Sequence, residues 1–277
     1  LDTTDARILM ELDQLYKKLR YPHRQRLDFL EAHTNEVEQR DDLCIERITL
    51  YNQLGEYQKA YDLINSRKFH PWEGGEGKVT SQYVFCRVEL AKQALAEKRY
   101  ADAVRLLKET EKYPDNLGEG KLSMAEENDI HYWLGCAYEG LGDMEQAKAY
   151  FERATKGSAE PAIAFFYNDQ QPDKIFYQGL AWRKLGEEDK ARSRFNRLIK
   201  HGEKHLFDKV KIDYFAVSLP DLLIWDDDLN VRNLIHCNLV MGLGYLGDKE
   251  QARKFLSEVV RLDINHQVGQ QLLKMCE

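Results

Sequence analysis

The chain has 277 residues, of which 43% are hydrophobic and 31% charged, enough apolar material for one elongated domain or two compact ones. Its formal net charge of −7 is the opposite of the basic excess that nucleic-acid-binding proteins usually carry, so we expect no nucleic acid partner. No apolar run approaches the roughly 20 residues that cross a bilayer, and the N-terminus lacks a signal-like apolar core. We therefore expect a soluble, cytoplasmic protein.

The first 40 residues predict a capping pair of helices. Amphipathic patterns cover residues 6–19 and 24–37, and Pro22 between them stops the first helix. Because the chain begins with Leu1 rather than Met, we expect it to be a fragment or a processed product of a longer protein.

Helix pairs of one kind recur along the rest of the chain. The clearest copy runs Tyr132-Trp-Leu-Gly-Cys-Ala-Tyr-Glu-Gly-Leu-Gly142, with small and large apolar residues three and four positions apart. No low-complexity linker interrupts the series, so we predict a single domain over 1–277. We place the pairs near 41–67, 84–110, 128–154, 172–198 and 233–259, a short C-terminal cap over 266–277, and Gly55, Gly142, Gly186 and Gly247 at the turns within pairs.

One alanine in each second helix sets the period. These alanines are 43, 44, 44 and 61 residues apart, at Ala60, Ala103, Ala147, Ala191 and Ala252. The pairs resemble the tetratricopeptide repeat, in which small residues let two antiparallel helices approach closely and aromatic residues fill the gaps between repeats. The resemblance implies an all-α, right-handed solenoid of antiparallel helix pairs. Since the motif needs only about 34 residues, each junction between pairs carries a long insert.

The first two inserts share the tetrad Gly-Glu-Gly-Lys. Its glutamates, Glu76 and Glu119, are 43 residues apart, equal to the local repeat step, so we expect the two tetrads at equivalent positions along one edge. Their Glu and Lys side chains either contact a polar ligand or pair between repeats in tight turns. The tetrads lack the GxxxxGK[ST] spacing of a phosphate-binding loop.

The third and last inserts, near 165–169 and 213–228, are unusually aromatic. They form either satellite cores that brace the edge or, with the first insert, a pocket of rings and carboxylates that suits a sugar or a polar peptide. The candidate binding residues are His70, Trp72, Glu73, Glu76, Lys78, Asn116, Glu119, Lys121, Asn168, Asp169, Asp213, Tyr214, Asp221, Trp225 and His236.

We predict no catalytic residue, no metal site and no cofactor in these 277 residues. Paired carboxylates on neighbouring inserts fit glycoside hydrolysis only at separations of roughly 5 to 10 Å, which sequence does not supply. His201 and His205 have the spacing of a zinc-binding pair, but Gly202 replaces the glutamate of an HExxH motif, so we interpret them as a helix-end surface. The five cysteines are widely spaced without a CxxC pair, which indicates reduced thiols.

The insert phrases resemble a more particular family. The two tetrad phrases, Tyr167-Asn-Asp169, the segment 213–228 and His236-Cys237 are similar to the C-terminal tetratricopeptide half of long bacterial proteins whose N-terminal half is a β-rich domain of unknown function. The resemblance implies a part of a multidomain protein in a carbohydrate-metabolism setting. It supplies no catalytic residues.

The inner faces of the first helices depart from another known pattern. Tetratricopeptide proteins that clamp acidic chaperone tails carry Lys and Asn there, whereas the corresponding positions here are mostly apolar, which favours a groove filled by the chain, a missing domain or an apolar partner segment. These positions are Ile45, Thr49, Val88, Lys92, Tyr132, Cys136, Phe176, Leu180, Cys237 and Met241. We therefore predict a non-enzymatic scaffold that binds a protein partner or its own N-terminal β-rich domain. The alternative is a carbohydrate-binding or active-site-completing module of a carbohydrate-active enzyme.

Overall fold

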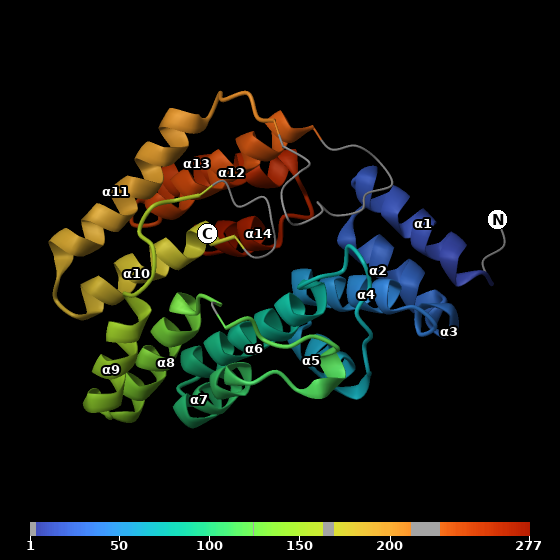
Figure 1. Cartoon of the computed structure of the whole chain (residues 1–277), viewed down its shortest axis with the longest axis horizontal. Helices are drawn as coiled ribbons and strands as arrows, with labels where there is room; N and C mark the ends of the chain where they lie inside the picture. The colour runs from blue at the N-terminus through green and yellow to red at the C-terminus, as the bar shows by residue number, and fades with distance from the viewer. Residues whose placement is uncertain (1–3, 124, 163–168, 212–227) are drawn as a thin grey trace. The chain divides into compact units, whose positions relative to one another are not determined.

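The computed structural model describes residues 4–123, 125–162, 169–211 and 228–277, and every regular element in these ranges is a helix (Figure 1). The all-α fold class predicted from the sequence is confirmed. The chain divides into two compact units, residues 1–97 with 105–123 and residues 98–104 with 124–277, so that the boundary falls within α7 (Tyr100–Lys108). The assignment of both units to a single domain stays a prediction.

The N-terminal cap of the first unit contains three helices rather than the predicted two. They are α1 (Ala6–Lys18), α2 (His23–Ala32) and α3 (Thr34–Val37). The carboxylate of Asp5 accepts a hydrogen bond from the backbone N–H of Arg7 at 2.8 Å and so caps the start of α1. The predicted second helix is interrupted at His33, which has a non-helical ψ of 40°.

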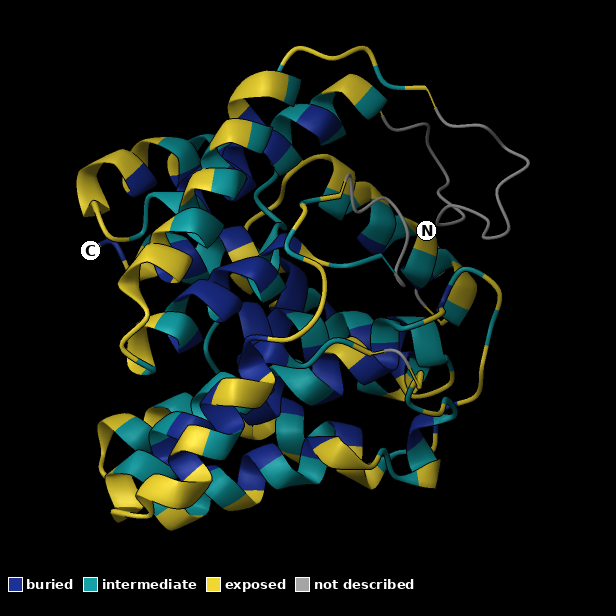
Figure 2. Ribbon diagram, turned by 60° about the vertical axis from the view of Figure 1, so that its left-hand side comes forward, coloured by how far each residue is buried: buried dark blue, intermediate teal, exposed yellow. Residues whose placement is uncertain are grey.

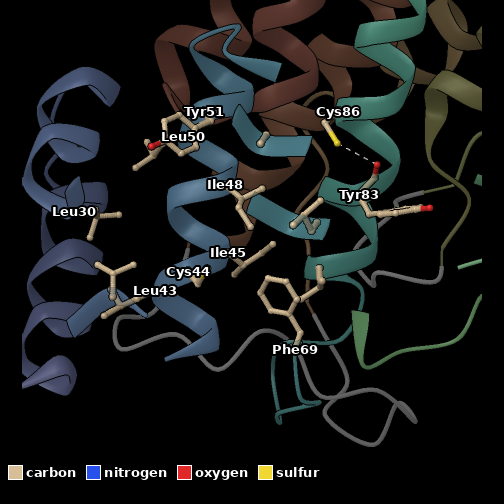
Figure 3. Packing of buried hydrophobic residues seen from close by; sticks show 14 of the residues in the cluster. Leu30, Leu43, Cys44, Ile45, Ile48, Leu50, Tyr51, Phe69, Tyr83 and Cys86 are labelled. Atoms are coloured by element: carbon tan, nitrogen blue, oxygen red, sulfur yellow. Dashed lines mark hydrogen bonds between the residues drawn. The ribbon is translucent and has the colours of Figure 1, made fainter. Parts of the chain in front are cut away.

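Two helix pairs complete the first unit. The first is α4 (Asp41–Gln53) with α5 (Tyr57–Ser66), and the second is α6 (Lys78–Ala96) with α7, followed by the short 3-10 helices η1 (Glu109–Glu111) and η2 (Asp115–Leu117). Helix α4 packs against α2, α5 and α6. Figure 3 shows the resulting core, in which Leu30, Ile48 and Phe69 are at most 1% exposed.

The second unit stacks the remaining helices in chain order. It contains α8 (Asn128–Leu141), α9 (Met144–Ala154), α10 (Pro172–Lys184), α11 (Glu188–His205), α12 (Leu229–Gly244), α13 (Lys249–Leu262) and α14 (Gln267–Lys274). Each pair packs internally, α10 packs on α8 and α9, α12 packs on α10 and α11, and α14 covers α13. This order is the one expected of successive helix-pair repeats.

The period-setting alanines are all buried within the helix packing. Ala60, Ala103, Ala147, Ala191 and Ala252 are all fully buried, as predicted for Ala147 and Ala191. A small residue is also required on the first helix of these pairs. A Cβ on Gly135 would lie 2.5 Å from the ring of Phe151, and one on Gly179 would lie 2.4 Å from the ring of Phe195. In Figure 2, buried positions face neighbouring helices and exposed positions line the outward sides.

The four predicted glycines all lie at turns within pairs. Gly55, Gly142 and Gly186 have φ values of 81°, 80° and 81°, a left-handed conformation that glycine adopts without strain. Gly247 lies between α12 and α13 but is not left-handed, and Lys98, with φ 59°, supplies the left-handed residue of the turn between α6 and α7.

Buried charges in the first unit are paired. The guanidinium of Arg26, 1% exposed, bonds both carboxylate oxygens of Asp13 at 3.0 and 2.7 Å and reaches Glu46 at 3.0 Å. Arg87, 2% exposed, donates to Glu109 at 3.1 Å and to the side-chain oxygen of Asn65 at 2.8 Å. Such pairs fix the register between helices, because an unpaired buried charge is strongly unfavourable.

Candidate functional site

The loop between α5 and α6 is held to α4 through one carboxylate. Asp41, in the first turn of α4, accepts hydrogen bonds from the backbone N–H of His70 at 2.9 Å and from the guanidinium of Arg67 at 2.7 Å, and its carboxylate lies 3.1 Å from the imidazole Nδ1 of His70. Burial acts to raise the pKa of Asp41, but the bonds from Arg67 and His70 outweigh it and hold that pKa below its usual value. The side chain of His70 is itself 72% exposed.

The two Gly-Glu-Gly-Lys tetrads touch each other. A carboxylate oxygen of Glu119 accepts a hydrogen bond of 2.9 Å from the backbone N–H of Gly77, the residue that precedes α6. This contact suits the partial positive charge of a helix N-terminus. Burial, with a contribution from Glu76, raises the pKa of Glu119. Lys78 is the first residue of α6 and is half-buried.

Trp72 packs inward rather than standing free on the loop. Its side chain is half-buried against the core of the first unit, and its indole lies directly over Gly75, where an added Cβ would come within 2.1 Å of the ring. The neighbouring carboxylates of Glu73 and Glu76 are exposed. Trp72 therefore braces the loop that carries these acids.

Asn116 and Lys121 bind backbone carbonyls. The amide nitrogen of Asn116 donates to the carbonyl oxygens of Ile64 at 2.9 Å and Arg67 at 2.8 Å, at the end of α5. The ammonium of Lys121 donates to the carbonyl of Thr110 at 3.2 Å, within η1. Both side chains satisfy carbonyl groups at helix ends, a structural role that the sequence did not distinguish from ligand contact.

The remaining candidates lie in the second unit or outside the described residues. Asp169 is in the segment before α10, and His236 is half-buried on α12. Asn168, Asp213, Tyr214, Asp221 and Trp225 lie outside the described residues. The gathering of all candidates around one pocket stays a prediction.

Three aromatic residues of α8 and α10, Tyr132, Trp133 and Tyr177, form an aromatic row that was not among the candidate binding residues. The ring of Tyr177 lies 5.6 Å from that of Tyr132 and 6.1 Å from that of Trp133, measured between centroids. The indole N–H of Trp133 donates to the hydroxyl of Tyr177 at 3.3 Å. All three side chains are half-buried. This contact could have been predicted from the sequence, because Trp133 and Tyr177 are 44 residues apart, which equals one repeat step.

Ion pairs join the same two helices at both ends of the row. The ammonium of Lys174 lies 2.5 Å from Asp129 and 3.6 Å from Asp173, and Lys184 pairs with Glu139 at the other end. Burial acts against the charge of Lys174, but the two aspartates prevail and raise its pKa. These pairs set the spacing of α8 and α10 and so position the rings between them.

The equivalent positions in the first unit carry charges instead of rings. One and two repeat steps before Trp133 are Glu89 and Glu46. Glu89 pairs with Lys92 at 2.7 Å, while Glu46 pairs with Lys17 at 2.8 Å and with the buried Arg26. The aromatic row is thus a property of the two repeats of the second unit that begin with α8 and α10.

Comparison with known families identifies these two repeats. A family model described as tetratricopeptide repeat matches residues 129–159, and a second model of the same description matches 175–201. The chain carries tetratricopeptide repeats. The matched segments contain Tyr132, Trp133 and Tyr177, and tetratricopeptide repeats in general present extended surfaces to other proteins. Among the described residues, none of the helices is both long and apolar enough to cross a membrane.

The solved structures that match the chain have low sequence identity to it. The chain is 15% identical to a chain of the APC/C hetero-tetramer Cut9-Hcn1, at a TM-score of 0.42, covering 99% of this chain and 43% of that one. It is 14% identical to YrrB, a TPR protein with an unusual peptide-binding site, at a TM-score of 0.31, covering 87% of this chain and 97% of that one. It is 11% identical to the C-terminal part of a TPR repeat-containing protein from Cytophaga hutchinsonii, at a TM-score of 0.28, covering 95% of this chain and 99% of that one.

Proposed function

We propose that this chain is a protein-binding scaffold and that the aromatic row of Tyr132, Trp133 and Tyr177 is its partner-binding surface. The observation that carries the proposal is the half-buried state of three large rings in mutual contact on two neighbouring repeats. Rings of this kind supply much of the binding energy of protein interfaces, because they bury a large apolar area with little loss of side-chain entropy.

The polar contacts of the row favour an apolar partner segment. The indole N–H of Trp133 is already directed to the hydroxyl of Tyr177. The ammonium groups of Lys174 and Lys184 are held by carboxylates of α8 and not presented as a clamp for an acidic tail. An apolar or aromatic side chain is therefore the expected anchor of the partner. The resemblance of the inserts makes the β-rich domain of the parent protein our first candidate for that partner.

A carbohydrate-binding role for the loop around His70 is the alternative raised by the sequence. The contacts of Asn116, Glu119 and Lys121 are made to backbone groups of the chain itself, and Trp72 covers Gly75. These contacts favour a bracing role for the loop, and we place the scaffold function first.

Selection from a phage-displayed library of random peptides tests the proposal. We expect peptides with an apolar or aromatic anchor to bind the unmodified chain, and Trp133→Ala to weaken that binding at least about tenfold. Phe207→Ala is the matched control, because Phe207 is 85% exposed and lies outside the row. Peptides that bind both variants equally well would place the binding surface elsewhere, and failure to select any peptide would count against the scaffold function.

A further inference from the structure

Three histidines meet where α11 packs against α12. His201 and His205 are one turn apart on α11, with ring centroids separated by 4.6 Å, and the ring of His236 on α12 lies 6.0 Å from that of His201. All three are half-buried. His201 and His205 lie in the last turns of α11, as interpreted from the sequence, and the ring of His201 also faces His236 of the next repeat.

Few charges of opposite sign face this histidine cluster. Lys204 of α11 lies beside the cluster. Asp208 follows the end of α11, and its carboxylate lies 2.6 Å from the Nδ1 of His205. His236 faces His201, the carbonyl of Ala162 and the residue that caps α14, His266, which has Asp263 beside it. Among the described residues, the one carboxylate in direct contact with the cluster is that of Asp208, and it contacts His205.

His236 is poorly placed to carry a charge. Its Nε2 is shielded from solvent and has no hydrogen-bond partner in the described part of the chain. Burial, with contributions from His201 and His266, lowers its pKa to about 4, although the hydrogen bond to the backbone of Ala162 acts in the opposite direction. Burial also lowers the pKa of His201, with His205 and Lys204 acting in the same direction. The folded arrangement therefore favours neutral rings at His201 and His236.

The helices around the cluster are too closely packed to relieve a new charge by a small shift. A Cβ on Gly202, next to His201, would lie 2.7 Å from the carbonyl oxygen of Cys237, next to His236. On the same interface, a Cβ on Gly244 would lie 2.8 Å from the carbonyl oxygen of Phe195. The backbones are in contact at both points, so added repulsion between rings is relieved by separation of the helices.

We propose that His201, His205 and His236 form an acid-sensitive joint that holds α12 against α11 at neutral pH and releases it as the pH falls through about 6. The sign follows from linkage. A histidine whose pKa is lower in the folded than in the open state stabilises the folded state at pH values above its open-state pKa. For His236 the open-state pKa is 6.5, and this stabilisation is lost as the pH falls from there toward the folded-state pKa of about 4. The joint would loosen the last helix pair while leaving the aromatic row of α8 and α10 assembled.

Hydrogen exchange of the whole chain, with a chelator present and rates corrected for intrinsic exchange, tests the joint. For His236 alone, the open-to-closed ratio at about pH 5.5 is about tenfold that at about pH 7.5, so we expect about tenfold faster exchange in α12 and little change in α8 and α10. The variant His236→Gln is neutral at both pH values and is expected to lose most of this acceleration. Equal acceleration in the wild type and in His236→Gln would overturn the proposal.

A second measurement keeps the proposal testable if His236→Gln does not fold. Nuclear magnetic resonance titration of the wild-type histidine ring protons is expected to show His236 neutral well below pH 6.5, and His201→Gln is expected to reduce the exchange response several-fold. Titration of His236 at its ordinary value, or exchange in α12 that does not respond to pH, would show that the cluster is not a joint.

Discussion

The indole N–H of Trp133 and the hydroxyl of Tyr177 form a 3.3 Å hydrogen bond between residues 44 positions apart, at equivalent places in adjacent repeats. The same repeat step that stacks the helices thus brings their aromatic residues into contact. In a repeat fold, equivalent positions of adjacent repeats lie next to each other, so aromatic residues at the same position of two repeats come into contact.

We expect Tyr177→Phe to lower the free energy of unfolding by about 0.5 to 1.5 kcal/mol, since it removes the hydroxyl that Trp133 contacts and little else. Urea denaturation followed by far-UV circular dichroism measures this. A double-mutant cycle with Trp133→Phe is the control, with an expected coupling of about 0.5 to 1 kcal/mol. Strictly additive effects would show that the bond adds no stability.

Ala147→Leu is expected to destabilise the second unit by about 1 to 3 kcal/mol, because Ala147 is fully buried where α9 meets α8 and the larger side chain overpacks the contact. Thermal melts of the variant and of Ala101→Leu give the comparison. Ala101 is exposed on α7, so its substitution is expected to leave the melting temperature nearly unchanged. Equal melting temperatures for both variants would contradict the register of the repeat.

Asn116→Ala is expected to destabilise the first unit by about 1 to 3 kcal/mol, because the carbonyls of Ile64 and Arg67 lose the amide that bridges them. Asn35→Ala, at an exposed position of α3, is the matched control with an expected effect near zero. Chemical denaturation of both variants decides between a bracing role and a ligand contact, since removal of a purely ligand-binding amide would leave stability unchanged.

The ion network of Glu46 makes the first unit sensitive to acid. Burial opposes ionisation, but Lys17 and Arg26 prevail and lower the pKa of Glu46 to about 2. A carboxylate with a lowered folded-state pKa contributes stability above its unfolded value of 4.5 and loses it as the pH falls from there toward 2. Burial raises the pKa of Asp13 in the same network, against the opposing effect of Arg26.

We therefore expect Glu46→Gln to reduce stability at neutral pH by a few kcal/mol and to flatten the loss of stability below about pH 4.5. Denaturation midpoints measured across the acid range give both quantities. A variant whose stability still falls as steeply as that of the wild type between pH 4.5 and 2 would assign the acid sensitivity to other carboxylates.

The sequence by itself determined the helices, their pairing and the close contacts within each pair. Ala147, Ala191 and Gly142 could be placed in advance, because burial at a helix crossing and a left-handed turn each leave a local pattern of small residues at fixed spacing. The split of the capping helix at His33 was missed, since the amphipathic pattern of residues 24–37 runs through it without a break.

The tertiary structure decided which polar residues brace the fold and which rings meet. Glu119 was a candidate ligand contact until packing brought its carboxylate to the N–H of Gly77, 42 residues away. His201 and His236 likewise stand 35 residues apart, and only the close approach of α11 and α12 at Gly202 brings their rings together. Contacts between distant segments depend on the angle and distance at which helices pack, and no local spacing in the sequence encodes these quantities.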